Sequence, residues 1–77
     1  MTRVTLSRPV EIGATELRVL ERLRITRTGK GLLASKEPAA ILIRTAGESR
    51  AFDADGDEIP LHRLRLQYPH LSELDDY

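Results

Sequence analysis

The sequence has no cysteine and no tryptophan, and its three aromatic residues are Phe52, Tyr68 and Tyr77. Without cysteine, the chain cannot form a disulfide framework or a thiolate metal site. Small secreted domains usually need such crosslinks, so we expect a cytoplasmic protein. A chain of 77 residues buries about 60–65% of the surface that its unfolded form exposes. We therefore predict one small domain, residues 1–77, with a thin core.

Long apolar segments are missing as well. The apolar run that includes Ala40–Ile43 is far shorter than the ~18 residues of a membrane span. The N-terminal residues Met1–Pro9 carry charges where a signal peptide requires an unbroken apolar core. We expect neither membrane association nor export.

The formal net charge is zero, because 12 basic residues balance 12 acidic ones. The two signs are nevertheless separated along the chain. Residues 1–50 hold ten Lys and Arg against five acidic residues, about +5, whereas residues 51–77 hold seven acidic residues against two Arg, about −5. Such a dipolar chain favours contact with another protein, or pairing between its own halves, over extensive phosphate binding.

Turn residues in the middle of the chain bracket two extended runs. Ala40–Ile43 is uninterrupted apolar sequence, which is typical of a strand covered on both faces. Gly47 can adopt the positive φ of a tight turn, and Ser49–Phe52 then runs back. Asp55-Gly56 repeats the turn signal before Ile59. These features predict a three-stranded antiparallel meander that ends near Ile59.

The N-terminal residues Thr2–Ile12 alternate between apolar and polar side chains, which predicts a strand with one buried face. The side chains assigned to that face are Val4, Leu6, Val10 and Ile12. Pro9 has no amide hydrogen to donate, so the strand should lie at a sheet edge or be broken at this residue.

Residues Thr15–Thr28 fit two alternatives. A helix would begin with Thr15 as its N-cap and end before Gly29. Its apolar face would hold Leu17, Val19, Leu20 and Leu23. A strand would instead place alternate residues on one face, namely Leu17, Val19, Leu23 and Ile25. The helix is favoured by a narrow margin, although the strict alternation of Arg22–Arg27 weakens it after Leu23.

Glycine and proline divide the rest of the chain. Gly29-Lys30-Gly31 predicts a flexible basic turn, and Pro38 should close the connection before the meander. Pro60 suits the first turn of a helix, which we place at Leu61–Gln67. A second helical turn should follow at His70–Leu74.

The last residues, Asp75–Tyr77, should fray. Before them, four side chains recur at helical spacing on the C-terminal segment and form an apolar stripe. These candidates for contact with a partner protein are Leu61, Leu64, Tyr68 and Leu71.

Two loop motifs are incomplete. Thr28–Gly31 resembles part of a phosphate loop, but Arg24 stands where the first glycine is required and Gly31 where Ser or Thr must hold magnesium. Three aspartates at alternate positions, Asp53, Asp55 and Asp57, have the initial spacing of a calcium loop. The glycine that such a loop needs at its sixth position is replaced by glutamate, so we interpret the segment as a solvated turn.

Catalytic constellations are missing too. His62 and His70 are the only histidines, and Pro69 separates them, so they predict neither a metal pair nor a proton relay. None of the serines lies in a Gly-x-Ser-x-Gly context. We therefore expect no enzymatic activity, no catalytic residue, no bound metal and no cofactor.

The densest basic segment is a candidate for phosphate contact. Its side chains are Arg18, Arg22, Arg24, Arg27 and Lys30. Glu16 and Glu21 dilute this charge, and no aromatic residue lies nearby to stack on bases. A solvated face, partly paired with the acidic C-terminal segment, is the simpler interpretation.

The opening Val4–Gly13, followed by Thr15–Leu17 and Arg27–Leu33, resembles the N-terminal part of Mu-type phage tail assembly chaperones. In that family an extended leucine, basic residue, proline opening leads into a second strand and a short helix. The likeness covers residues 4–34, and the family then continues into helices, whereas this chain continues into predicted strands. The resemblance implies a small phage or prophage protein that works by binding another protein.

These patterns together predict an α+β fold, in which a small antiparallel sheet, built from the meander and the N-terminal strand, packs against one or two short helices. The predicted function is a non-catalytic protein-interaction or assembly module that binds through an exposed sheet edge or through Leu61–Leu74. Two alternatives remain open. One is a small nucleic-acid-associated or regulatory protein that uses Arg18–Lys30. The other is a homo-oligomeric structural component whose thin core is completed by a second copy.

Overall fold

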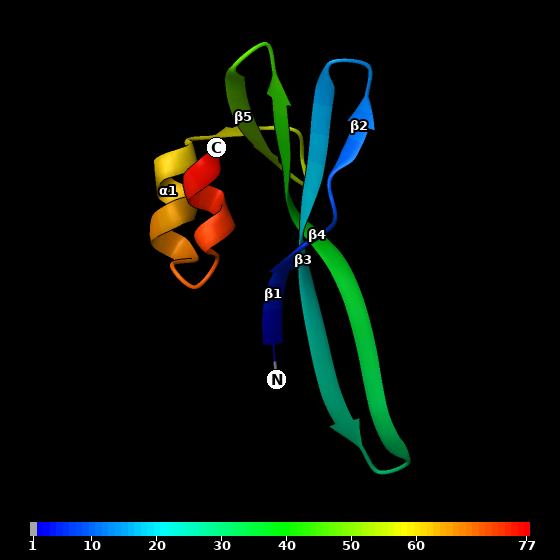
Figure 1. The fold of residues 1–77 in the computed structure, drawn as a ribbon. Helices are drawn as coiled ribbons and strands as arrows, with labels where there is room; N and C mark the ends of the chain where they lie inside the picture. Colours follow the sequence, from blue (N-terminus) through cyan, green and yellow to red (C-terminus); the bar gives the residue numbers. More distant parts are fainter. Residues whose placement is uncertain (1) are drawn as a thin grey trace.

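The computed structural model describes residues 2–77 as an antiparallel sheet of six strands with one α-helix and one 3₁₀-helix (Figure 1). The strands are β1 (Thr2–Leu6), β2 (Val10–Ile12), β3 (Thr15–Thr28), β4 (Gly31–Thr45), β5 (Glu48–Asp53) and β6 (Glu58–Ile59). The helical elements, α1 (Leu61–Gln67) and η1 (Ser72–Asp76), follow the last strand. The predicted α+β fold is confirmed.

The predicted meander is formed by β4, β5 and β6, which lie next to one another in the sheet. Ala46 and Gly47 both have positive φ, 50° and 77°, as the tight turn between β4 and β5 requires. At the next turn, one carboxylate oxygen of Asp53 accepts hydrogen bonds from the amides of Asp55 and Asp57, each 2.9 Å long. The aspartates therefore stabilise a turn by bonding its backbone.

The strands β3 and β4 form one long hairpin that extends well beyond the rest of the sheet (Figure 1). Their pairing runs from Thr15 opposite Thr45 to Thr28 opposite Gly31. The narrowly favoured helix over Thr15–Thr28 is therefore wrong. A single 14-residue helix is marginally stable on its own, whereas alternating side chains gain a complete partner strand in the hairpin.

Pro38 does not end the segment before the meander, contrary to the prediction. β4 continues through Pro38, and the two strands form a β-bulge beside it. Leu20 pairs with Ala40 but Glu21 pairs with Pro38, so Ala39 is the extra residue of the bulge. The pairing of β4 with β5 begins only at Ala40. Pro38 thus lies where β4 is itself an edge strand, a position that tolerates the missing amide hydrogen.

The N-terminal strand is broken at Ser7–Pro9 and lies along one edge of the sheet, as Pro9 predicts. The break changes the phase of the alternation. Leu6 in β1 faces Leu20, whereas Val10 in β2 faces Leu17, so the two segments direct their apolar side chains to opposite faces. The prediction of a single buried face is therefore wrong, and Val10 is 56% exposed.

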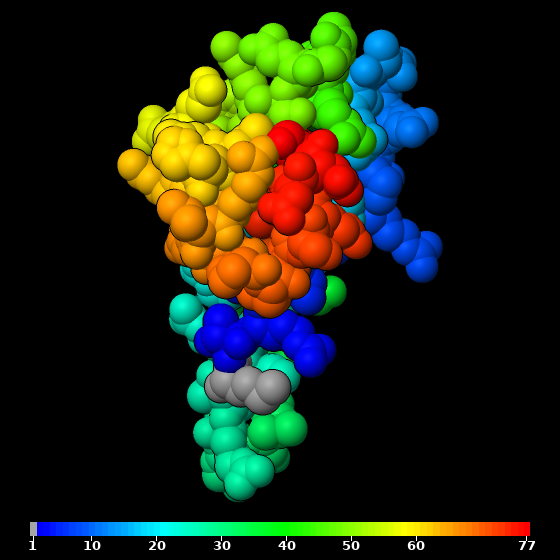
Figure 2. Space-filling model, turned by 60° about the vertical axis from the view of Figure 1, so that its left-hand side comes forward, coloured from blue at the N-terminus to red at the C-terminus, as the bar shows by residue number. Residues whose placement is uncertain are grey.

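The core lies between one face of the sheet and the two helical elements, which cover the upper part of the molecule in Figure 2. Its buried residues are Leu20, Ala40, Leu42, Ala51, Leu64 and Leu74. α1 begins after Pro60 and spans the predicted residues. The expectation that Ala40–Ile43 is covered on both faces is wrong, because Ile41 points away from the core and is 36% exposed.

The substitution Leu42→Ala should lower the free energy of unfolding by about 2–5 kcal/mol, because Leu42 is fully buried and its removal leaves a cavity in a thin core. Urea denaturation measures the change. Leu66→Ala, on the exposed side of α1, is the matched control and should stay within about 0.5 kcal/mol of the original chain. Equal midpoints for the two variants would contradict the assignment of the core.

Candidate interaction surface

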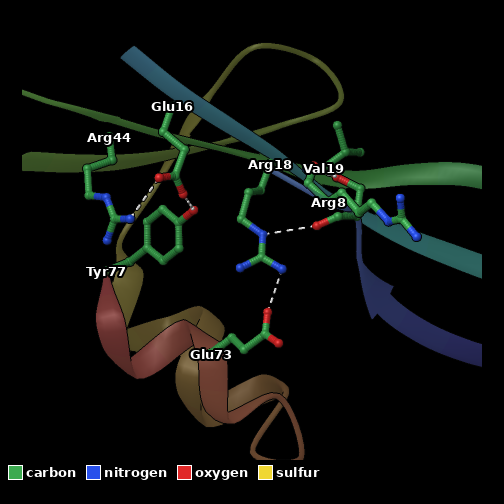
Figure 3. Close-up of polar contacts among 8 residues, drawn as sticks. Arg8, Glu16, Arg18, Val19, Arg44, Glu73 and Tyr77 are labelled. Atoms are coloured by element: carbon green, nitrogen blue, oxygen red, sulfur yellow. Dashed lines mark hydrogen bonds and ion pairs between the residues drawn. The ribbon is translucent and has the colours of Figure 1, made fainter. Parts of the chain in front are cut away.

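A polar cluster at the C-terminus attaches the helical layer, formed by α1 and η1, to the sheet (Figure 3). Glu16 of β3 accepts hydrogen bonds from Arg44 of β4 and from the hydroxyl of Tyr77, both 2.9 Å long. The Arg44 guanidinium lies 4.8 Å from the centroid of the Tyr77 ring. The expectation that Asp75–Tyr77 frays is therefore wrong, because Tyr77 is held by an ion-paired carboxylate and a cation–π contact.

Arg18, two residues after Glu16 on β3, forms a second polar contact between the sheet and the helical layer (Figure 3). Its guanidinium pairs with Glu73 of η1, and its Nε donates to the carbonyl of Ser7, 3.0 Å away. The Arg18 side chain is only 16% exposed. The helical layer is thus pinned to the sheet face that carries Glu16 and Arg18.

These contacts change the pKa of each member of the Glu16 cluster. Hydrogen bonds from Arg44 and then from Tyr77 lower the pKa of the Glu16 carboxyl below its ordinary value of 4.5. Burial, followed by the hydrogen bond to Glu16, raises the pKa of the Tyr77 hydroxyl above 10.0. The hydrogen bond to Glu16 also raises the pKa of Arg44. The cluster is therefore fully formed at neutral pH, with Glu16 ionised and Tyr77 protonated.

The opposite face of the sheet, which we call the outer face, is covered by no helix of residues 2–77. The register places alternate side chains of β3 there, and their neighbours on β2, β4 and β5 are mostly apolar. The apolar residues of the outer face are Val10, Ile12, Leu17, Val19, Leu23, Ile25, Leu32, Ala34, Ile41, Ile43 and Phe52. Uncovered apolar side chains gathered on one face of a sheet are typical of a binding surface.

The lower part of the hairpin, residues 22–37, projects from the body and is here called the arm (Figures 1 and 2). It makes the molecule elongated, with extents of 50 × 27 × 23 Å. The radius of gyration is 14.2 Å, against about 11–12 Å for a compact chain of this length. Near its tip, Leu32 and Leu33 are 68% and 64% exposed. The arm therefore presents apolar side chains well away from the core.

The structure separates the five residues predicted to contact phosphate. Arg18 is occupied by Glu73 and Ser7. Arg22 and Arg24 share one face of the arm, where Arg24 lies 3.7 Å from Glu37, whereas Arg27 belongs to the outer face. Lys30 lies in the turn at the tip. Four of these cations remain along the arm, on different sides of it.

The four residues predicted to contact a partner lie in the helical layer. Leu64 is 2% exposed and belongs to the core, and Leu61, Tyr68 and Leu71 are partly buried against it. Their main contribution is to attach the C-terminal segment to the sheet. Sequence reasoning missed the outer face, although the alternation of Leu17, Val19, Leu23 and Ile25 in the strand alternative carried that signal.

Within residues 2–77, no group of three or more His, Asp or Glu side chains could hold a metal ion. His70 uses Nε2 to donate to the carbonyl of Val4, 3.2 Å away. No helix in the same residues is long and apolar enough to cross a membrane.

No protein-family model matches this chain, and neither does any curated protein or solved structure. The resemblance to Mu-type phage tail assembly chaperones therefore stays a prediction. The short helix that this resemblance implies is not found in residues 4–34, which form strands and turns.

Stability should fall on the acid side in a way that depends on Glu16. Because folding lowers the pKa of this carboxyl, its contribution to stability is present above pH 4.5 and is lost as the pH falls through the lower, folded-state pKa. Urea midpoints measured between pH 7 and pH 2.5 should decline less for Glu16→Gln than for the original chain. Asp55→Asn, in an exposed turn, is the control and should follow the original profile. Parallel profiles for all three proteins would refute the coupling.

Proposed function

We propose that this protein is a non-catalytic protein-interaction or assembly module of phage or prophage type, and that it binds through the outer face of its sheet. The single observation that supports the proposal is the set of apolar side chains on the outer face of β3 and β4, which occur on both the body and the arm and which no helix of residues 2–77 covers. Burial of apolar surface is the main driving force of most protein association. An apolar face that residues 2–77 leave open is suited to burial by a partner.

Two features favour the outer face over the exposed edges of the sheet. The edges of the arm carry lysine and arginine side chains, which hinder the addition of a further strand. The outer face, in contrast, offers several half-buried aliphatic side chains on rigid paired strands, with charged residues such as Arg50 and Glu58 beside them. Apolar side chains with charged residues beside them are common in protein interfaces.

The double variant Val10→Glu/Leu32→Glu should lose most of its capture of host proteins from a native lysate, because it places two charges among the apolar residues of the outer face. Both side chains are largely exposed, so the fold should persist, and circular dichroism checks this. Leu66→Glu introduces a charge on the opposite layer and is the matched control. Mass spectrometry compares the captured proteins. Equal capture by both variants would exclude the outer face as the binding surface.

A second candidate function is contact with nucleic acid, which is favoured by the cations of the arm. A two-stranded ribbon fits the major groove of DNA, and Arg22 and Arg24 project from one face of this ribbon. Among residues 2–77, no ion pair occupies Arg22, Arg27 or Lys30. These side chains are therefore free to approach phosphates.

This second function predicts a steep dependence on salt. With about four phosphate contacts, the association constant should fall about 100-fold or more between 50 and 200 mM salt. Fluorescence anisotropy with labelled DNA and RNA measures it, and Arg22→Gln/Arg24→Gln should reduce the logarithmic slope by about two. Absence of binding at the lowest salt would remove this function.

A further inference from the structure

We propose that the outer face is covered by the outer face of a second copy of this chain, in an antiparallel arrangement that places the arm of each copy over the body of the other. This inference rests on the proposed function and names the partner. Its basis is the distribution of charge and apolar residues on the outer face, together with the size of that face.

The charges of the outer face differ between the arm and the body. Around the arm, the register places Arg3, Arg27 and Lys36 on this face, with Glu21 as the acidic residue, so the sum is +3 − 1 = +2. On the body, it places Glu48 and Glu58 there with Arg50 between them, so the sum is −2 + 1 = −1. The two ends of one face thus carry opposite net charge.

This difference selects the orientation of the second copy. If the two arms were stacked on each other, the basic ends of the two outer faces would lie together, which is unfavourable. Reversing one copy brings the basic arm over the acidic body, twice in the same dimer. A closed two-fold dimer satisfies this condition, because each copy uses the same surface.

The apolar residues match in the same orientation. A two-fold axis at the middle of the hairpin, near Glu21 and Pro38, exchanges positions that are equally far from it along β3. Ile25 and Leu17 are each four residues from Glu21, and they pair with Ala34 and Ile43 on β4. The pair of Ile25 and Ala34 in one copy therefore faces the pair of Leu17 and Ile43 in the other. Ile25 then lies opposite Leu17, and the small Ala34 lies opposite the larger Ile43, so that side chains of the two sheets can interdigitate.

Near the axis, Glu21 of one copy would approach Glu21 of the other. Lys36 lies 3.7 Å from the Glu21 carboxylate within the same chain, so a cation is available to each of them. The hollow formed by Val19, Glu21, Lys36, Glu37 and Pro38 lies at this point of the hairpin. The centre of the interface is therefore charge-compensated.

The two long strands of the outer face supply much of the area that a dimer needs. β3 and β4 contain 14 and 15 residues, and at about 3.3 Å per residue and 4.8 Å per strand they present a flat area on the order of 450 Å² to the same strands of a second copy. Stable complexes bury about 800 Å² of accessible surface per partner, and accessible surface exceeds flat area. Two stacked sheets would also enclose a second core, which complements the thin first core.

Sedimentation equilibrium over a concentration series tests the stoichiometry. We expect a mass of twice 8.7 kDa, and Val10→Glu/Leu32→Glu should weaken the dimer at least 10-fold, whereas Leu66→Glu should not. A monomer at every concentration would overturn the inference, whether or not that monomer binds DNA.

Crosslinking tests the orientation of the two copies. Because the chain has no cysteine, a bis-maleimide reacts with the introduced thiol alone. Leu17→Cys and Ile25→Cys are each treated with a short bis-maleimide, alone and after mixing. The antiparallel dimer predicts covalent dimers in the mixture and few in either variant alone. Arms stacked on each other predict the reverse, which would overturn the proposed arrangement.

The same variants separate this inference from the proposed function. A monomer whose capture of host proteins is abolished by Val10→Glu/Leu32→Glu would overturn the second copy as partner and leave the outer face as a binding surface. A monomer whose capture is unchanged by the double variant would overturn both.

Discussion

The pairing of β3 with β4 is the constraint on which the rest of the structure depends. Thirty-one residues of the chain, from Thr15 to the end of β4 with the turn between them, belong to one hairpin, and each of the other strands pairs with it or with a neighbour of it. Because strand side chains alternate, this hairpin also separates the molecule into two faces. Whether a residue belongs to the core or to the exposed surface therefore depends on the face of the hairpin that it occupies.

The polar clusters at Glu16 and Arg18 determine which face becomes the core. Both residues lie on the same side of β3 as Leu20, and each binds the C-terminal segment, through Tyr77 and Glu73. Arginine and carboxylate groups held in this way provide direction as well as attraction, because their hydrogen bonds require specific geometry. The helical layer is thereby fixed to one face, and the outer face is left open.

An open apolar face on a small sheet connects the architecture with the proposed function. Residues 2–77 have few buried side chains and no helix over the arm, and the two ends of the outer face carry opposite charge. A partner that buries the outer face would extend the core and compensate these charges. A second copy does both with a single surface, which is why it is the occupant we favour over an unrelated protein or a nucleic acid.

The local turn chemistry was predictable from the sequence alone. Gly47 and the Asp55-Gly56 pair located the meander, and Pro60 located α1, because backbone conformation and missing amide hydrogens act within a few residues. The expected binding residues were less informative, since apolar residues at helical spacing attach a helix to its own sheet as readily as to a partner.

Tertiary structure alone decided the conformation of Thr15–Thr28 and the face on which Val10 and Ile12 lie. The first depends on β4, which pairs with this segment from Gly31 opposite Thr28 to Thr45 opposite Thr15, and its cross-strand contacts outweigh a weak helical preference. The second depends on the break at Ser7–Pro9, where one additional residue reverses the alternation. The sequence by itself determined where the chain turns, whereas long-range pairing determined which side chains are buried, because burial depends on register between segments that no local pattern specifies.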